Sequence, residues 1–252
     1  LELTNNGIEH ISESELKEYH ETVERVNRIC KEAFDADVPV FIDAEESWIQ
    51  TTIDQLTYEM MAKYNQETAI IYNTFQMYRH DMLANLKAAV ETAQEKNYYL
   101  GVKLVRGAYL EKERQKAHED EYSEPLHVSK EDTDRDYDLG VELCLKNVER
   151  VHFCMGTHNE SSCLRLCDAM NALQIPSNHP NIYFAQLLGM SDNISYNLAA
   201  SGYNVAKYVP YGPVDAVMPY LFRRAEENSS IAGQTSREFA LLQKEVNRRN
   251  NA

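Results

Sequence analysis

The sequence predicts an α/β protein built on the pattern of a (βα)8 barrel, of which six strands can be recognised. Two observations support this: short apolar runs rich in β-branched residues recur roughly every 30 residues, and amphipathic helical patterns lie between them. This alternation is typical of parallel sheets. The expected strands are 38–42, 69–73, 100–105, 151–155, 182–187 and 205–208. The expected helices are 12–34, 48–64, 80–96, 132–146, 160–173, 215–227 and 236–249.

Polar residues follow the predicted strands and favour a barrel over the alternative, an open six-stranded sheet. In (βα)8 barrels the functional residues gather at the carboxyl ends of the strands. No GxG or GxxxxGK pattern occurs, so neither a dinucleotide-binding motif nor a P-loop is indicated. The residues at or just after the six strand ends are Asp43, Asn73, Arg106, His158, Gln186 and Tyr208.

Composition limits the classes of function. The 252 residues are 43% hydrophobic and 26% charged, which suits one large domain over 1–252, and the net charge of -15 makes nucleic acid an improbable partner. Five cysteines without a CxxC pair do not indicate a zinc or disulfide framework, and we expect no metal site. No apolar run is long enough to span a bilayer. A polar stretch, 119–135, is expected to form a loop or lid between two helices.

The segment from Lys103 to Tyr109 carries the strongest single signal. Its apolar strand contains one cation, Lys103, and is followed by another, Arg106, and a glycine then allows the chain to turn. Buried charges are costly unless they are paired. The pattern therefore indicates either an anion-binding site or a structural ion-pair network.

A second cluster lies near the carboxyl terminus, in the sequence YLFRRAEEN at 220–228. If this segment is helical, Arg223 and Glu227 share one face. Adjacent arginines with fork-shaped heads suit the bidentate capture of a carboxylate. The alternative is a solvated helix with ordinary salt bridges. Two further residues are equally open: Asp43 either caps the next helix or pairs with a cation in the barrel mouth, and His158 is either a satisfied polar residue or a functional one.

Taken together, KLVRGAY at 103–109, THN at 157–159, QLLGM at 186–190, YVPYGP at 208–213 and YLFRRAEEN at 220–228 resemble the proline dehydrogenase family. The resemblance is to the monofunctional branch that includes the mitochondrial enzyme of animals. It implies a distorted (βα)8 barrel whose last helix lies over the mouth. It also implies a flavoenzyme that oxidises L-proline to Δ1-pyrroline-5-carboxylate, with noncovalent FAD at the carboxyl face and a quinone as the electron acceptor.

The resemblance also implies roles for individual residues. Arg223 and Arg224 match the pair that clamps the proline carboxylate, and Tyr208 matches the tyrosine that packs on the substrate ring. Lys103 matches a cation near the reactive flavin edge. The remaining substrate positions are Asp43, the acid expected to pair with the carboxylate-binding arginine, and Leu104, Ala108, Tyr109 and Glu227. The remaining positions at or near FAD are Asn73, Gln76, Arg106, His158, Asn159 and Gln186.

One family feature has no counterpart. The family carries a further lysine on an early strand, which would precede Leu1, and two barrel strands are missing from the pattern. We therefore expect the amino-terminal part of the barrel to lie outside this sequence. The resemblance implies peripheral contact with an energy-transducing membrane. The location would be the mitochondrial inner membrane or matrix in a eukaryote, and the cytoplasmic side of the inner membrane in a bacterium.

Three other readings stay open. A Schiff-base aldolase on the same barrel would use Lys103 as its nucleophile. A hydroxyproline dehydrogenase of the same family would be a close rival, although such relatives tend to carry a smaller residue where Tyr208 stands. A non-catalytic fragment or binding module would also be compatible with the missing strands.

Overall fold

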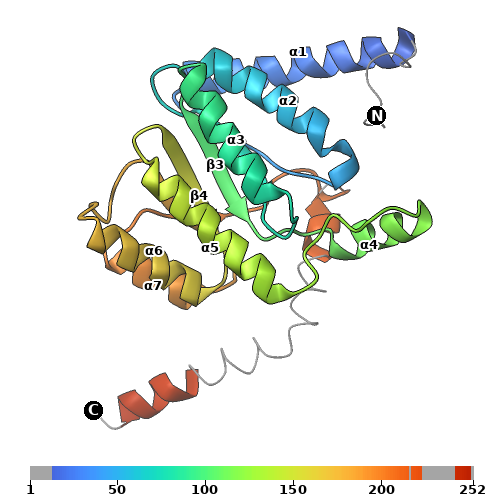
Figure 1. Ribbon diagram of the computed structural model, residues 1–252. Coiled ribbons are helices and arrows are strands. Elements are labelled where there is room, and N and C mark those ends of the chain that lie inside the picture. Colours follow the sequence, from blue (N-terminus) through green and yellow to red (C-terminus); the bar gives the residue numbers. More distant parts are fainter. Residues whose placement is uncertain (1–12, 216, 223–241, 251–252) are drawn as a thin grey trace. The chain divides into compact units, whose positions relative to one another are not determined.

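The computed structural model describes residues 13–215, 217–222 and 242–250, and six strands form one sheet in chain order (Figure 1). The pairings from β1 to β5 are all parallel, and the sheet curls into half of a barrel. The α/β prediction with a distorted (βα)8-type arrangement is confirmed, with each predicted strand found within three residues of its expected bounds. The strands are β1 (Val40–Ile42), β2 (Ile71–Gln76), β3 (Leu100–Val105), β4 (Val151–Gly156), β5 (Ile182–Leu187) and β6 (Val205–Tyr208).

Helices α1 to α7 lie between residues 13 and 200, and most match the expected ranges. Residues 217–222 and 242–250 are also helical, whereas much of the predicted helices 215–227 and 236–249 lies outside the described residues. The helices are α1 (Glu13–Asp35), α2 (Ser47–Tyr64), α3 (Met82–Glu95), α4 (Leu110–Glu119), α5 (Lys130–Lys146), α6 (Glu160–Ala172) and α7 (Asp192–Ala200).

The predicted loop over 119–135 is wrong in its second half, because α5 already begins at Lys130. Ser129 explains the earlier start: its hydroxyl accepts a hydrogen bond from the Asp132 amide at 3.0 Å and so caps the helix. Helix α4 is the helix expected before this stretch, for which sequence analysis set no bounds, and α7 had not been predicted. The loop that remains, 120–129, forms an antiparallel bridge between Leu126 and Arg79.

The core lies between the sheet and the helices that cover one of its faces. In β3, Leu100, Val102 and Leu104 are fully buried in this core, so the alternation of a strand turns Lys103 toward the opposite, inner face of the half-barrel. Helix α2 packs on β2, α3 on β2 and β3, and α5 on β3 and β4, as Figure 1 shows for α3 and α5 in front of the strands.

The chain divides into two compact units, residues 1–207 and 208–252. Within the second unit, the rings of Tyr208 and Tyr220 lie 5.4 Å apart.

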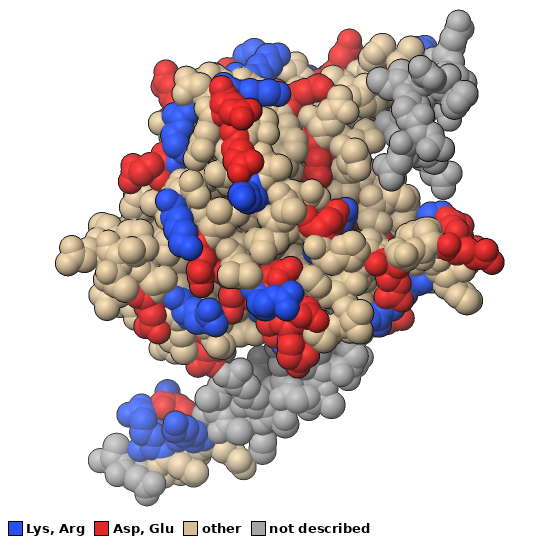
Figure 2. Space-filling view, viewed as in Figure 1, with Lys and Arg blue, Asp and Glu red and all other residues tan. Residues whose placement is uncertain are grey.

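No helix among the described residues is long and apolar enough to cross a membrane. On the face seen in Figure 2, acidic and basic side chains are interspersed.

Asn65 joins the amino ends of the strands, at the edge opposite the candidate site. Its side chain is fully buried. The amide nitrogen donates to the carbonyls of Ile71 and Tyr99 at 2.8 and 3.0 Å. The amide oxygen accepts from the backbone N–H groups of Ile70 and Ile71 at 3.0 and 2.9 Å. The side chain therefore uses its full hydrogen-bonding capacity between β2 and the start of β3.

Asn65→Asp should destabilise the protein by about 3 kcal/mol or more, because the new carboxylate would face two carbonyl oxygens and lose both donors. Thermal unfolding measures the loss. Gln66→Glu is the matched control, since Gln66 is the exposed neighbour and the change is chemically the same. Equal melting temperatures for the two variants would contradict this assignment.

Candidate functional site at the carboxyl edge of the sheet

Lys103 and Asp43 form an ion pair at the carboxyl edge of the sheet. Lys103 projects from the inner face of β3, and Asp43 follows β1 directly. The ammonium group of Lys103 also lies 5.8 Å from the centre of the Phe41 ring, a cation–π distance. Of the two roles left open for Asp43, the structure shows the pairing with a cation: the N-cap position of α2 is occupied by Glu46.

Arg106, just after β3, is held by three protein side chains. Its Nε donates to Asp134 at 2.6 Å, and its terminal nitrogens donate to Thr157 at 2.7 Å and Ser162 at 3.0 Å. The guanidinium carbon lies 4.2 Å from the centre of the Tyr137 ring. These contacts fix the orientation of the guanidinium, whose side chain keeps 22% of its surface exposed.

The carboxylate of Asp134 is shared between Arg106 and Lys130. Burial by itself would raise the pKa of Asp134, but the hydrogen bonds from Lys130 and Arg106 outweigh it and lower that pKa. Asp134 is therefore a charged anchor for Arg106. Sequence analysis had not singled it out, because only the folded chain brings α5 next to the end of β3.

The turn after β4 connects to the same network. The Thr157 hydroxyl accepts from Arg106 and from the Asn159 amide at 3.1 Å. Asn159 caps α6 by accepting from the Ser162 amide at 3.2 Å. The Nδ1 atom of His158 lies 3.0 Å from the Ser191 hydroxyl. This turn is therefore shaped by its own hydrogen bonds, and His158 links it to the loop after β5.

Two glutamines at the strand ends also bind the scaffold. Gln76 is 3% exposed and donates to the Glu45 carbonyl at 2.7 Å, which holds the loop that carries Asp43. Gln186 is 2% exposed, donates to the Thr157 carbonyl at 3.2 Å and accepts from Ser195 at 2.8 Å. Both side chains stabilise the loops at the carboxyl edge.

The structure separates Asn73 and Leu104 from the other predicted residues. Asn73 is fully buried and donates to Asp54 of α2 at 2.8 Å. Leu104 belongs to the core on the helix side of β3, opposite Lys103. Because neighbouring strand residues point to opposite faces, these two side chains face the helices and not the inner face of the half-barrel. The proposed substrate contact of Leu104 is not supported by this placement.

The turn from Gly107 to Tyr109 leads from β3 into α4. Gly107 has a φ of +132°, and a Cβ atom there would lie 2.4 Å from the Tyr78 ring, so only glycine fits. Ala108 follows, and Tyr109 occupies the N-cap position of α4. The Lys112 ammonium lies 5.5 Å from the centre of the Tyr109 ring. Tyr109 is thus placed at the same edge as Lys103 and Arg106.

The remaining predicted residues are in the second unit. Tyr208 ends β6 and contacts Tyr220. Arg223, Arg224 and Glu227 lie outside the described residues. The structure therefore brings together Asp43, Lys103, Arg106 and Tyr109 at one edge, and it leaves the arginine pair as an expectation.

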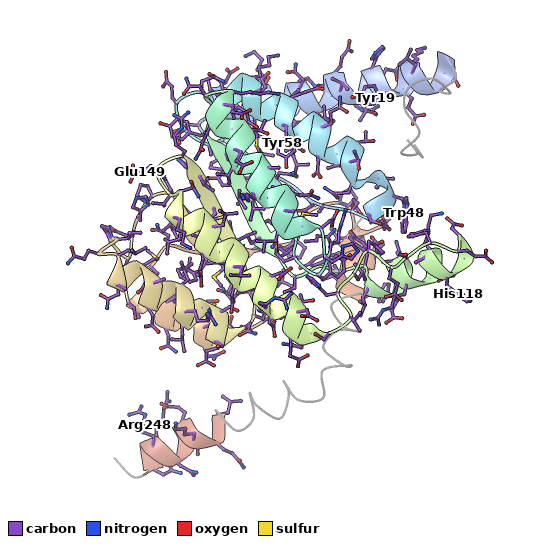
Figure 3. The ribbon with its side chains drawn as sticks, in the orientation of Figure 1. Tyr19, Trp48, Tyr58, His118, Glu149 and Arg248 are labelled. Carbon is purple, nitrogen blue, oxygen red and sulfur yellow. The ribbon has the colours of Figure 1, made fainter. Side chains whose placement is uncertain are left out.

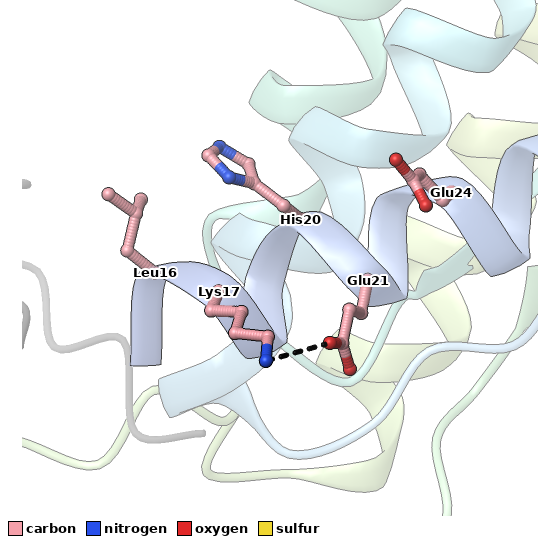
Figure 4. A pocket seen from close by; sticks show the side chains of 5 residues that line it. All are labelled: Leu16, Lys17, His20, Glu21 and Glu24. Carbon is pink, nitrogen blue, oxygen red and sulfur yellow. Dashed lines mark ion pairs between the residues drawn. The ribbon is translucent and has the colours of Figure 1, made fainter. Parts of the chain in front are cut away.

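Other features of the described residues do not form a site of this kind. The pocket in Figure 4 is lined by Leu16, Lys17, His20, Glu21 and Glu24, which all belong to α1, and Lys17 and Glu21 pair across 3.9 Å. Side chains on one face of one helix make a surface feature and not an enclosed cleft. No group of three or more metal-ligating side chains is present in the described part of the chain.

Phe41 is a site residue that sequence analysis missed. It alternates with Val40 and Ile42, which pack against the core, so it faces the inner side next to Tyr72, with ring centres 5.0 Å apart. The alternation of apolar residues in β1 could have revealed this, but in a three-residue strand the pattern is too short to stand out.

The fold resembles solved structures of a larger protein. Proline utilization A (PutA) from Bdellovibrio bacteriovorus, in a structure described as inactivated by N-propargylglycine, matches with a TM-score of 0.79 at 23% identity. The match covers 86% of this chain and 22% of that one. At this identity the likeness shows a shared fold.

Curated relatives match at higher identity. Proline dehydrogenase 1, mitochondrial, from Drosophila melanogaster is 36% identical over 252 residues, covering 96% of this chain and 37% of that protein. The human protein of the same name is 39% identical over 246 residues, covering 96% of this chain and 41% of that protein. Hydroxyproline dehydrogenase from Xenopus laevis is 37% identical over 253 residues, with 99% and 54% covered.

The chain therefore spans between 37% and 54% of the length of these three relatives. A family model described as proline dehydrogenase matches residues 2–237, which is nearly the whole sequence. On this match and on the similarity to the relatives, the chain belongs to the proline dehydrogenase family.

Proposed function

We propose that the complete protein oxidises L-proline to Δ1-pyrroline-5-carboxylate with FAD as the hydride acceptor. The observation that carries the proposal is the Lys103–Asp43 pair at the carboxyl edge of the half-barrel, in a chain of the proline dehydrogenase family. Functional residues of such barrels gather at this edge. The human and Drosophila relatives carry proline dehydrogenase in their names, which supports proline as the substrate.

The donors at this edge fit a flavin nucleotide. Lys103 and Arg106 supply positive charge beside β3, and Arg106 is partly exposed although three side chains hold it. A guanidinium has more N–H groups than these three bonds use, so it can still donate to an anionic or carbonyl group. When bound, FAD would accept hydride from C5 of proline, the carbon that becomes doubly bonded to nitrogen in Δ1-pyrroline-5-carboxylate. Arg106, Lys103 and His158 would hold it.

The chain's own residues orient the substrate. Arg223 and Arg224 would clamp the carboxylate by bidentate hydrogen bonds, which fixes the direction of the ring. Tyr208 would pack on the ring, with Ala108, Tyr109 and Glu227 beside it. Lys103, fixed by Asp43, would place a positive charge where negative charge develops during hydride transfer. Gln76 and Gln186 support the loops that present these groups.

The electron acceptor and the location follow from the same family. We propose a quinone as the acceptor, which would require peripheral contact with an energy-transducing membrane. The relatives from Drosophila and human are named as mitochondrial proteins, which supports a mitochondrial location in a eukaryote. In a bacterium the corresponding place is the cytoplasmic side of the inner membrane.

A second candidate is the oxidation of hydroxyproline, because the Xenopus relative named hydroxyproline dehydrogenase is 37% identical to this chain. Tyr208 favours proline, since a tyrosine against the ring leaves little room for a hydroxyl group.

The hypothesis of a Schiff-base aldolase is weaker. An amine nucleophile works from a neutral state in an apolar pocket, whereas Lys103 is bound to the Asp43 carboxylate.

Arg223→Ala and Arg224→Ala should each raise the KM for proline and lower kcat/KM roughly ten- to a hundred-fold. Each removes a charge-assisted contact worth about 1.5–3 kcal/mol. Steady-state kinetics of the complete enzyme with proline measure the change. Arg249→Ala is the control, because Arg249 makes an exposed ion pair with Glu245 on the last described helix. Unchanged kinetics in both test variants would refute carboxylate binding by this pair.

Tyr208→Ser should lower kcat/KM for proline and raise the ratio of hydroxyproline to proline oxidation. The smaller side chain opens space for a ring hydroxyl, and pocket contacts of this size are worth about 1–3 kcal/mol. The measurement is kcat/KM for proline and trans-4-hydroxyproline. Tyr208→Phe keeps the ring and should keep the preference for proline. If Tyr208→Ser leaves the ratio at its wild-type value, Tyr208 does not determine specificity.

A further inference from the structure

Glu113 of α4 is a buried carboxylate that no proposed catalytic step uses. It is 0% exposed, although glutamate is rarely buried so completely. One oxygen accepts from the Ser47 amide and the other from the Ser47 hydroxyl, both at 2.6 Å. Ser47 is the first residue of α2, so Glu113 grips the amino end of a helix that is 66 residues away in sequence.

The hydrogen bonds from Ser47 compensate the free-energy cost of burying the Glu113 carboxylate. The free N–H groups and the dipole at the amino end of α2 favour a negative group there, and the two hydrogen bonds occupy both carboxylate oxygens. Burial first, and then the negative charge of Glu113, raises the pKa of Tyr78, whose ring lies against Gly107. The carboxylate is therefore part of the packing around the turn after β3.

Two further contacts join the same helices. Lys112 of α4 pairs with Glu46 at 2.7 Å. The Lys116 ammonium lies 5.4 Å from the ring centre of Trp48, which Figure 3 shows at the end of α2 nearest α4. Helix α4 therefore contacts three consecutive residues at the amino end of α2: Glu46, Ser47 and Trp48. The buried contact of Glu113 is with the middle one, Ser47.

The clamped helices are those that follow two loops of the candidate site. Asp43 lies four residues before Ser47, and Tyr109 lies four residues before Glu113. The loop after Asp43 is also held by the side chains of Gln50 and Gln76. The Glu45 amide donates to Gln50 at 2.9 Å, and the Glu45 carbonyl accepts from Gln76 at 2.7 Å. The Glu113–Ser47 contact is the buried link, among these contacts between α4 and α2, that ties this loop to the turn after β3.

We propose that Glu113 is a positioning residue: by clamping α4 to the amino end of α2, it fixes Asp43 and Tyr109 relative to each other at the substrate site. The inference rests on the proposed function. Both carboxylate oxygens are engaged and the side chain is shielded from solvent, so Glu113 acts on the substrate through Asp43 and Tyr109 and not by contact.

The chemistry of the clamp predicts a difference between two substitutions. In Glu113→Gln, the amide oxygen still accepts from the Ser47 amide, and the amide nitrogen donates to the Ser47 hydroxyl, which can reverse its role. The clamp survives without its charge. In Glu113→Ala both contacts are lost. A general acid or base would behave otherwise, since the glutamine variant would then be as inactive as the alanine variant.

The test is steady-state kinetics with proline in the complete, flavin-loaded enzyme. Glu113→Ala should raise the proline KM and lower kcat/KM roughly ten- to a hundred-fold through misplacement of the site, whereas Glu113→Gln should stay within about three-fold of wild type. Glu119→Ala, on the exposed last turn of α4, should match wild type. Asn65→Ala, at the opposite edge of the sheet, should lower the melting temperature and leave the proline KM unchanged.

Hydrogen exchange provides a readout that does not depend on turnover. The amide of Ser47 should exchange faster in Glu113→Ala than in wild type and in Glu113→Gln. The positioning role would be overturned if Glu113→Ala left the proline KM unchanged. It would also be overturned if Asn65→Ala raised the proline KM as much as Glu113→Ala does. Loss of activity in Glu113→Gln with a protected Ser47 amide would overturn it in favour of a chemical role. Absence of proline oxidation in the wild type would instead refute the proposed function. The exchange result would still show whether Glu113 holds the amino end of α2.

Discussion

The parallel order of the strands is the constraint on which the rest of the structure depends. Because β1 to β5 pair in parallel and in chain order, these five strands end at the same edge, and the loops that follow them meet there. Asp43 and Lys103 are 60 residues apart in the chain, yet they pair because β1 and β3 flank β2. The candidate site therefore follows from the topology of the sheet together with the direction in which single strand residues point.

Charge compensation is the second theme of this edge. The chain has a net charge of -15, and each of the two cations near the end of β3 is paired with a carboxylate: Lys103 with Asp43, and Arg106 with Asp134, which Lys130 also contacts. With both cations paired inside the scaffold, the capture of a substrate carboxylate falls to the arginine pair at 223 and 224 under our proposal. Glu113 is also a charged group compensated within the scaffold: its buried negative charge is balanced by the amino end of α2.

The sequence predicted the sheet well because each strand is a short apolar run between polar turns. It gave no bounds for α4, whose sequence LEKERQKAHE buries only Glu113 and Ala117 and so lacks an apolar stripe. It also missed α7, a nine-residue helix that follows Ser191 in a left-handed conformation. Such short or polar helices depend on tertiary contacts, which local patterns do not report.

The site was predictable in part. Strand periodicity places Lys103 on the inner face, and the same periodicity places Leu104 on the helix side, which matching of motifs by position does not reveal. The partners of Arg106 come from α5, the β4 turn and α6, and only the folded chain brings them together. Arg223, Arg224 and Glu227 rest on the family resemblance alone.

The most direct test of the central claim is a double-mutant cycle on the Lys103–Asp43 pair, with the rate of flavin reduction by proline as the readout. Lys103→Met and Asp43→Asn should each slow reduction, and the double variant should be about as slow as the worse single variant. The coupling energy should then be at least about 1 kcal/mol, because the two side chains act as one unit. Additive effects, or a normal reduction rate in both single variants, would contradict the claim that this pair organises the site.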